Sequence, residues 1–217
     1  TKKSAPQPTM ELDLFAAPTG MGTVATVAHE YKIVERGAEL AEMVTRLRTA
    51  GRFCFDTETS GLDCFRDRIV GMSFSCEASK AWYVPASKEA FAELKPLFED
   101  EKVEKVGQNM KFDIMMLRSE GIEVKGFKYD TMLLHYLLDS ESRHNMDYLA
   151  QRYLDYMPIQ IESLIGRGSK QLTMDRVPLA QIAEYAAEDA DVTWRLFEGL
   201  WPEVQREGLE KLYRDIE

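Results

Sequence analysis

The segment RFCFDTE, residues 52–58, joins an apolar run of strand length to two carboxylates at its end. Such a run is typical of a strand buried in the middle of a sheet. Residues two apart in a strand point to the same face, so Asp56 and Glu58 can be directed at one point. Two buried like charges repel each other, and a divalent cation such as Mg²⁺ would remove the conflict. The D-x-E pattern is also common among solvated loop acids and helix caps, so alone it leaves both interpretations open.

Further strands and helices are expected on both sides of this segment. Strand patterns occur at residues 31–34, 68–76, 81–85, 103–107 and 127–129, with a hairpin link at 77–80. Helical patterns occur at residues 38–49, 88–98, 112–119, 131–138, 146–153 and 179–200, and Pro202 is expected to end or kink the last one. Residues 166–178 form a polar loop. This order predicts an α/β domain with a mixed sheet and helices on both faces.

Two further motifs supply carboxylates. Asn109 and Asp113 stand four residues apart where a strand passes into a helix, and Asn109 is also a candidate N-cap. Tyr185 and Asp189 share one face of the last long helix, although an ordinary amphipathic helix with solvated acids would look similar. With the D-x-E pair these residues form an ordered set. Two divalent ions held by such a set can clamp the attacking and leaving oxygens of a phosphodiester displacement, with Tyr185 orienting the water.

This set resembles the DEDD exonuclease superfamily in its tyrosine-bearing branch. Longer segments resemble the 3′–5′ proofreading exonuclease domain of bacterial DNA polymerase I, family A: FDTETSGLD (55–63), VGQNMKFD (106–113), DTML (130–133), RHNMDYLA (143–150), KQLT (170–173) and YAAEDADVT (185–193). The resemblance covers about residues 30–217. It implies a ribonuclease H-like fold, with a mixed five-stranded sheet flanked by helices, and release of deoxynucleoside 5′-monophosphates.

The resemblance also implies two divalent ions, Mg²⁺ or alternatively Mn²⁺ or Zn²⁺. Asp56, Glu58 and Asp189 match ligands of the first ion. Asp56 and Asp113 match the second site, the latter partly through water. Tyr185 matches the residue that orients the water.

Single-stranded DNA is the implied substrate, and six positions match DNA contacts: Leu62, Gln108, Asn109, Phe112, Met132 and Arg143. Core packing is the alternative for Leu62 and Met132, and a surface ion pair is the alternative for Arg143. Phe112 stands where close relatives often have Tyr, so stacking would survive and a hydroxyl contact would be lost.

Charge and composition limit how the protein can bind nucleic acid and in which cellular compartment it is expected. The formal charge of −10, from 37 acidic and 27 basic residues, argues against a broad basic surface that grips nucleic acid, although bound cations can supply local positive charge. No apolar run is long enough to span a membrane. The three cysteines fit no zinc or disulfide pattern, so a cytoplasmic protein is expected.

Residues 1–28 are rich in Pro, Thr, Ala and Gly and are expected to be a disordered linker. Residues 29–217 would form the exonuclease domain, expected to be monomeric and a fragment of a longer protein in which it is covalently linked to a polymerase domain. Two alternative functions stay open: a 3′–5′ exoribonuclease of the ribonuclease D kind, and a catalytically silent scaffold domain of a polymerase. The matches outside the catalytic motifs disfavour the first, and the intact set of carboxylates disfavours the second.

Overall fold

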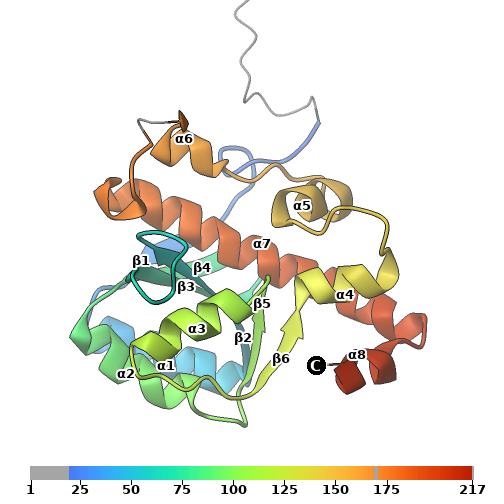
Figure 1. The fold of residues 1–217 in the computed structure, drawn as a ribbon, viewed down its shortest axis with the longest axis horizontal. Helices are drawn as coiled ribbons and strands as arrows, with labels where there is room; N and C mark the ends of the chain where they lie inside the picture. Colours follow the sequence, from blue (N-terminus) through green and yellow to red (C-terminus); the bar gives the residue numbers. More distant parts are fainter. Residues whose placement is uncertain (1–19, 169–170, 217) are drawn as a thin grey trace, which may run out of the picture.

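The computed structural model describes residues 20–168 and 171–216. Their centre is a mixed sheet with helices on both faces (Figure 1). Its strands lie in the order β1 (Glu30–Ile33), β4 (Lys80–Pro85), β3 (Ile69–Glu77), β2 (Arg52–Thr59), β5 (Glu104–Gly107) and β6 (Phe127–Asp130). The pairs β2–β3 and β3–β4 are antiparallel, and the other neighbours are parallel. The expected α/β class and mixed sheet are confirmed.

The expected number of five strands is wrong, because the sheet has six. All six strand patterns of the sequence enter the sheet, including the one expected at residues 31–34, which is β1 and pairs in parallel with β4 from Glu30 opposite Lys80 to Ile33 opposite Tyr83. It forms one edge of the sheet, and contacts with the long helix α7 (Leu179–Arg206) hold it there.

The helices form two layers, one on each face. On one face lie α1 (Gly37–Ala50), α2 (Lys88–Phe98) and α3 (Lys111–Ser119). On the other, α7 crosses the sheet, with α4 (Thr131–Leu138), α5 (Met146–Leu154) and α6 (Ile161–Ile165) packed against it (Figure 1). The 3-10 turn η2 (Met174–Arg176) precedes α7, and α8 (Glu210–Ile216) follows it.

The alternation of side chains along β2 decides which way its carboxylates point. Phe53 and Phe55 are buried in the cluster beneath α1 and α2, whereas Cys54 is buried in the cluster that faces α7. Since side chains alternate along a strand, Asp56 and Glu58 lie on the face of α7 with Cys54. Thr57 lies on the opposite face, toward α3.

Of the two outcomes expected at Pro202, an end or a kink of the last long helix, the end does not occur. The helix α7 continues through Pro202 to Arg206. A proline inside a helix removes one backbone hydrogen bond and costs about 3 kcal/mol. Leu200 and Val204 on either side of it are fully buried in the core, and this packing offsets the cost.

Asn109 is not the N-cap of α3, which is a second correction. The cap position is Met110, and its side chain accepts no hydrogen bond. Asn109 adopts a left-handed backbone conformation, with φ of 56°. The buried carboxylate of Asp130 accepts hydrogen bonds from the backbone N–H groups of Asn109, at 2.9 Å, and Met110, at 3.0 Å. These bonds fix the turn that leads into α3, ahead of its first helical residue.

Part of the expected linker at residues 1–28, namely residues 1–19, lies outside the described residues. Gly22 forms a parallel bridge with Tyr156, and its N–H donates to the carbonyl of Asp155 at 2.8 Å. The described chain thus contacts the domain before residue 29, where the domain was expected to begin. None of the helices in residues 20–168 and 171–216 is long and apolar enough to cross a membrane.

Candidate active site

Three carboxylates meet where the end of β2 faces the middle of α7. Asp56, Glu58 and Asp189 each offer an oxygen atom, and these atoms lie within 4.8 Å of one another. The alternation of β2 brings the first two onto the face of α7, and the packing of α7 across the sheet brings the third. Tertiary structure therefore joins the two distant motifs that the sequence suggested.

Two oxygen atoms in this cluster are buried without a hydrogen-bond partner among the described residues. They are Oε1 of Glu58 and Oδ1 of Asp189. A buried carboxylate oxygen without a donor is costly unless a cation neutralises it. The donor set consists entirely of oxygen, which suits a hard divalent cation such as Mg²⁺. The residues present therefore fit a metal ion.

The electrostatics of the cluster agree with this interpretation. Burial raises the pKa of Asp56 to about 7, although a hydrogen bond from the backbone of Thr57 opposes the shift. Burial raises the pKa of Glu58 and of Asp189 well above the usual range, and the charge of Asp56 adds to both shifts. Without a metal ion, burial and mutual repulsion thus favour the protonated forms of these carboxylates.

Asp113 reaches the site from α3, on the other side of β2. Its Oδ1 atom accepts hydrogen bonds from both the backbone N–H, at 3.1 Å, and the hydroxyl of Thr57. Burial raises its pKa, and the charge of Asp56 raises it further, which places the two carboxylates within electrostatic reach of each other. Asp113 is therefore next to the three-carboxylate cluster without being one of its three members.

Tyr185 stands one helical turn before Asp189 on α7. Burial raises the pKa of its hydroxyl far above the usual value, and the charges of Asp189 and Glu58 add to the shift. The hydroxyl therefore stays protonated at any physiological pH and can donate a hydrogen bond. It is the one phenol that lines the same cleft as the carboxylates.

A cleft of about 590 Å³ opens above the carboxylates. Six of the residues singled out from the sequence line it: Asp56, Glu58, Leu62, Phe112, Tyr185 and Asp189. Leu62 is 89% exposed, so it is not a core residue. Phe112 is half-buried and presents its ring to the cleft from α3.

The other four predicted DNA contacts do not line this cleft. Gln108 is engaged internally, because its amide donates to the carbonyl of His144 at 2.7 Å and accepts from the Thr131 hydroxyl. Asn109 and Arg143 are exposed, and Met132 is half-buried at the start of α4. Their contact with DNA stays a prediction.

Several residues that shape the site have only weak signals in the sequence. Asp130 and the segment 171–173 fall inside the quoted motifs DTML and KQLT, without a role assigned to them, and Lys170 lies outside the described residues. Ile161 and Ile165 of α6 form part of the far wall of the cleft, together with residues 171–174. No pattern in the sequence marked these two isoleucines, since a short apolar helix is not distinctive.

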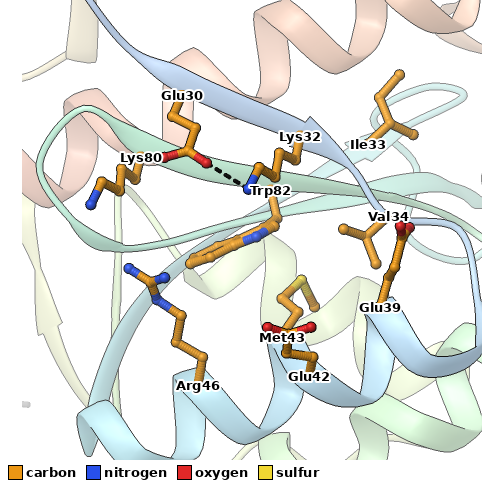
Figure 2. Close-up of a pocket in the computed structure, with 10 residues that line it drawn as sticks. All are labelled: Glu30, Lys32, Ile33, Val34, Glu39, Glu42, Met43, Arg46, Lys80 and Trp82. Atoms are coloured by element: carbon orange, nitrogen blue, oxygen red, sulfur yellow. Dashed lines mark ion pairs between the residues drawn. The ribbon is translucent and has the colours of Figure 1, made fainter.

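A second pocket, of about 400 Å³, lies between β1 and α1 and shares no lining residue with the cleft. Trp82 lies in it, with the guanidinium of Arg46 5.2 Å from the ring centre (Figure 2). Its charged side chains are of both signs, and several form ion pairs, as Lys32 does with Glu30 and Arg46 with Glu77. Within the described residues, the one group of three side chains able to hold a metal lies in the cleft.

Comparison with known proteins agrees with this geometry. The sequence profile of a family described as 3′–5′ exonuclease matches residues 31–205. DNA polymerase I of Pseudomonas aeruginosa is 40% identical over 204 residues, which cover 87% of this chain and 22% of the relative. DNA polymerase I of Rhizobium leguminosarum is 35% identical over 208 residues, covering 82% and 20%. The chain spans about a fifth of the length of these relatives.

Solved structures share the fold at lower identity. NrnC of Brucella melitensis with bound Mg²⁺ has a TM-score of 0.65 and 19% identity, covering 88% of each chain. Ribonuclease D of Trypanosoma brucei has a TM-score of 0.65 and 17% identity, covering 79% of this chain and 64% of that one. At these identities the likeness concerns the fold alone, and it confirms the expected ribonuclease H-like architecture.

Proposed function

The chain belongs to the 3′–5′ exonuclease family found in bacterial DNA polymerase I, and from this premise we propose that it removes nucleotides from the 3′ end of single-stranded or frayed DNA. In a longer protein it would serve as the proofreading domain of a covalently linked polymerase. The observation that carries the proposal is the cluster of Asp56, Glu58 and Asp189, with its two unpartnered buried oxygen atoms, in the wall of an open cleft.

The carboxylates would hold two divalent ions, with Mg²⁺ as the preferred metal and Mn²⁺ or Zn²⁺ as alternatives. Asp56, Glu58 and Asp189 would bind the first ion. Asp56 and Asp113 would hold the second, the latter partly through water, because Thr57 already engages Oδ1 of Asp113. When bound, such ions lower the pKa of a water molecule and stabilise the oxygen that leaves.

The remaining side chains of the cleft would bind and orient the substrate. Tyr185 keeps its proton, so its hydroxyl can hold the water that attacks the phosphorus. Leu62 and Phe112 offer apolar surfaces to the terminal nucleotide. Gln108, Asn109, Met132 and Arg143 would contact the strand outside the cleft. The products would be deoxynucleoside 5′-monophosphates.

The cellular setting is part of the same proposal. Cys54, Cys64 and Cys76 are all free thiols, as expected of a protein in a reducing cytoplasm. The cleft is built from one chain, so a monomer suffices for catalysis. With a net charge of −10, the domain would bind DNA weakly by itself, and a basic surface of the linked polymerase would deliver the frayed 3′ end.

Digestion of single-stranded DNA by the purified chain tests the activity. We expect nucleotides to be released from the 3′ end with Mg²⁺ or Mn²⁺ and not with a chelator. Asp56→Ala should be inactive, whereas Glu42→Gln, which changes an exposed carboxylate of α1, should match the wild type. Equal release by the wild type and Asp56→Ala would mean that a contaminant does the work.

Parallel assays with DNA and RNA oligonucleotides of the same sequence separate this proposal from the exoribonuclease alternative. We expect faster release from DNA. A clear preference for RNA would contradict the proposed substrate. No release from either, by a folded chain supplied with metal, would favour the scaffold alternative.

A further inference from the structure

The loop between β2 and β3, residues 60–68, presents two large apolar side chains to solvent. Leu62 is 89% exposed and Phe65 is 90% exposed, more than any other large hydrophobic residue of the described chain. Leaving an aromatic ring in water forgoes the free energy of burying it, and grouped exposed apolar side chains mark binding sites. The residues that start this loop, from Ser60 to Leu62, line the active-site cleft. Phe65 does not line the cleft itself, but it follows the cleft-lining Leu62 by three residues in the same loop and so lies near the cleft.

Hydrogen bonds within the loop fix its conformation and thereby keep these two side chains exposed. The carboxylate of Asp67 accepts from the Ser60 hydroxyl and from the backbone N–H of Asp63, both at 2.9 Å. The side chain of Asp63 accepts from the backbone N–H of Phe65 at 3.0 Å. Cys64 points inward and packs against the core beneath the sheet. The ring of Phe65 is thus directed outward by an ordered turn.

The glycine at position 61 supports the same turn. A side chain there would collide with the carboxylate of Asp67, so only glycine lets Asp67 close the loop. The loop lies on the side of the molecule where α3 and α6 face each other across the cleft (Figure 1).

The charges of the loop indicate what it binds. Arg66 pairs with Asp63 at 3.6 Å, and Arg68 pairs with Asp175 at 2.5 Å, so its cations are already matched by carboxylates. In a chain with a net charge of −10, attraction of phosphate groups is a weak source of affinity. A nucleobase can stack on an aromatic ring without any charge and with little regard to sequence.

We propose that Phe65 is a stacking platform for a nucleobase of the same DNA strand whose 3′ end occupies the cleft, upstream of the terminal nucleotide. This inference rests on the proposed exonuclease function, and it adds a binding position beyond the cleft. We expect the contribution of Phe65 to binding to depend on the length of the substrate. A dinucleotide would end before it reaches Phe65, whereas a longer strand would extend to it.

Kinetics on a series from dinucleotide to octanucleotide, with Phe65→Ala, Phe65→Trp and the wild type, test the proposal. Phe65→Ala should raise KM about tenfold on the octanucleotide, since a stacked base contributes about one order of magnitude in affinity, and kcat should change less than twofold. The ratio of its KM to that of the wild type should fall toward one on the dinucleotide. Phe65→Trp should restore the low KM. The matched control is Phe127→Ala, which removes an aromatic ring 46% exposed on β6.

The outcomes separate this inference from the proposed function. A wild type that releases no nucleotide at any length contradicts the exonuclease function itself. An active wild type with the same KM as Phe65→Ala at every length overturns the stacking role alone, and would assign the exposed ring to a protein surface. An equal rise in KM at all lengths also overturns it, because Phe65 would then act on the terminal nucleotide.

Discussion

Thr57 and Asp113 are joined by two hydrogen bonds, since the backbone N–H and the hydroxyl of Thr57 both donate to Oδ1 of Asp113. Thr57 stands between the two carboxylates of β2 and points to the opposite face of the strand. The pair therefore ties the carboxylate of α3 to the strand that carries Asp56 and Glu58. It also leaves one oxygen of Asp113 for other partners.

Thr57→Val should weaken metal binding, because it removes the hydroxyl donor while keeping the shape of the side chain. The hydrogen bond from the Thr57 hydroxyl lowers the pKa of Asp113, so its loss raises that pKa further and favours the protonated form, which binds metal poorly. We expect the Mn²⁺ concentration for half-maximal activity to rise about tenfold, which corresponds to about 1.4 kcal/mol. Titration of activity with Mn²⁺ measures this. Thr57→Ser, which keeps the hydroxyl, should stay near the wild type, and equal values for Val and Ser would contradict the role of the bond.

Asp189→Ala should abolish activity, whereas Tyr185→Phe should only reduce it. Asp189 is one of the three carboxylates of the cluster, so its loss disrupts the metal site itself. Tyr185→Phe leaves the carboxylates in place and removes a single hydroxyl, for which we expect a loss of about 10–100-fold in kcat. Single-turnover rates of the wild type and the two variants, measured with saturating Mn²⁺, test this prediction. Glu184→Gln, an exposed neighbour on α7, is the control and should behave as the wild type.

Asp56→Asn should be more stable than the wild type when no metal is present. Its folded pKa of about 7 lies above its unfolded value of about 4, so the folded state binds the proton more tightly. The stability contributed by this proton is present below about pH 4 and is lost as the pH rises to about 7. The advantage of Asp56→Asn should therefore grow by about 2 kcal/mol between about pH 5 and about pH 8.

Urea unfolding in the presence of a chelator measures this advantage at the two pH values. Added Mg²⁺ should stabilise the wild type more than Asp56→Asn, since the metal binds the ionised carboxylates. If Asp56→Asn is less stable than the metal-free wild type at about pH 8, the ionised carboxylate of Asp56 does not destabilise the folded state, and the prediction is contradicted.

Glu188→Ala should destabilise the fold and disturb the cleft. The buried Glu188 carboxylate accepts hydrogen bonds from the Tyr156 hydroxyl and the backbone N–H of Ile159, both at 2.6 Å. The segment it holds leads directly into α6, which lines the cleft. We expect the free energy of unfolding to fall by about 2–3 kcal/mol, since two buried donors lose a charged acceptor. Urea unfolding tests this, and Glu198→Ala, an exposed glutamate of the same helix, should change it by less than about 0.5 kcal/mol.

Much of the site could be predicted from local patterns. The buried strand at residues 52–57, its alternation and the helical spacing of Tyr185 and Asp189 are properties of short segments. They were sufficient to propose that Asp56, Glu58 and Asp189 share a site, and the structure brings these three together. The sequence patterns also placed most helices and strands within a few residues of their observed bounds.

The structure differs from the sequence-based predictions where contacts between residues distant in the sequence override local preference. Pro202 remains inside α7 because Leu200 and Val204 are buried around it. Asn109 does not cap α3 because it takes a left-handed turn conformation, and Asp130, twenty-one residues later, accepts the hydrogen bond of its backbone N–H. The resemblance implied five strands, and the strand expected at residues 31–34 becomes the sixth because it pairs with the edge strand β4. Neither burial nor a distant acceptor can be derived from the spacing of neighbouring residues.

The sequence by itself determined which residue types could form a metal site and the order in which they occur along the chain. Only the tertiary structure decided that Thr57 holds Asp113 from the opposite face of β2, that α6 forms the far wall of the cleft, and that Phe65 stands in solvent beside it. The physical reason is that periodicity depends on the geometry of one strand or helix. Burial and hydrogen-bond partners depend on the packing of all of them.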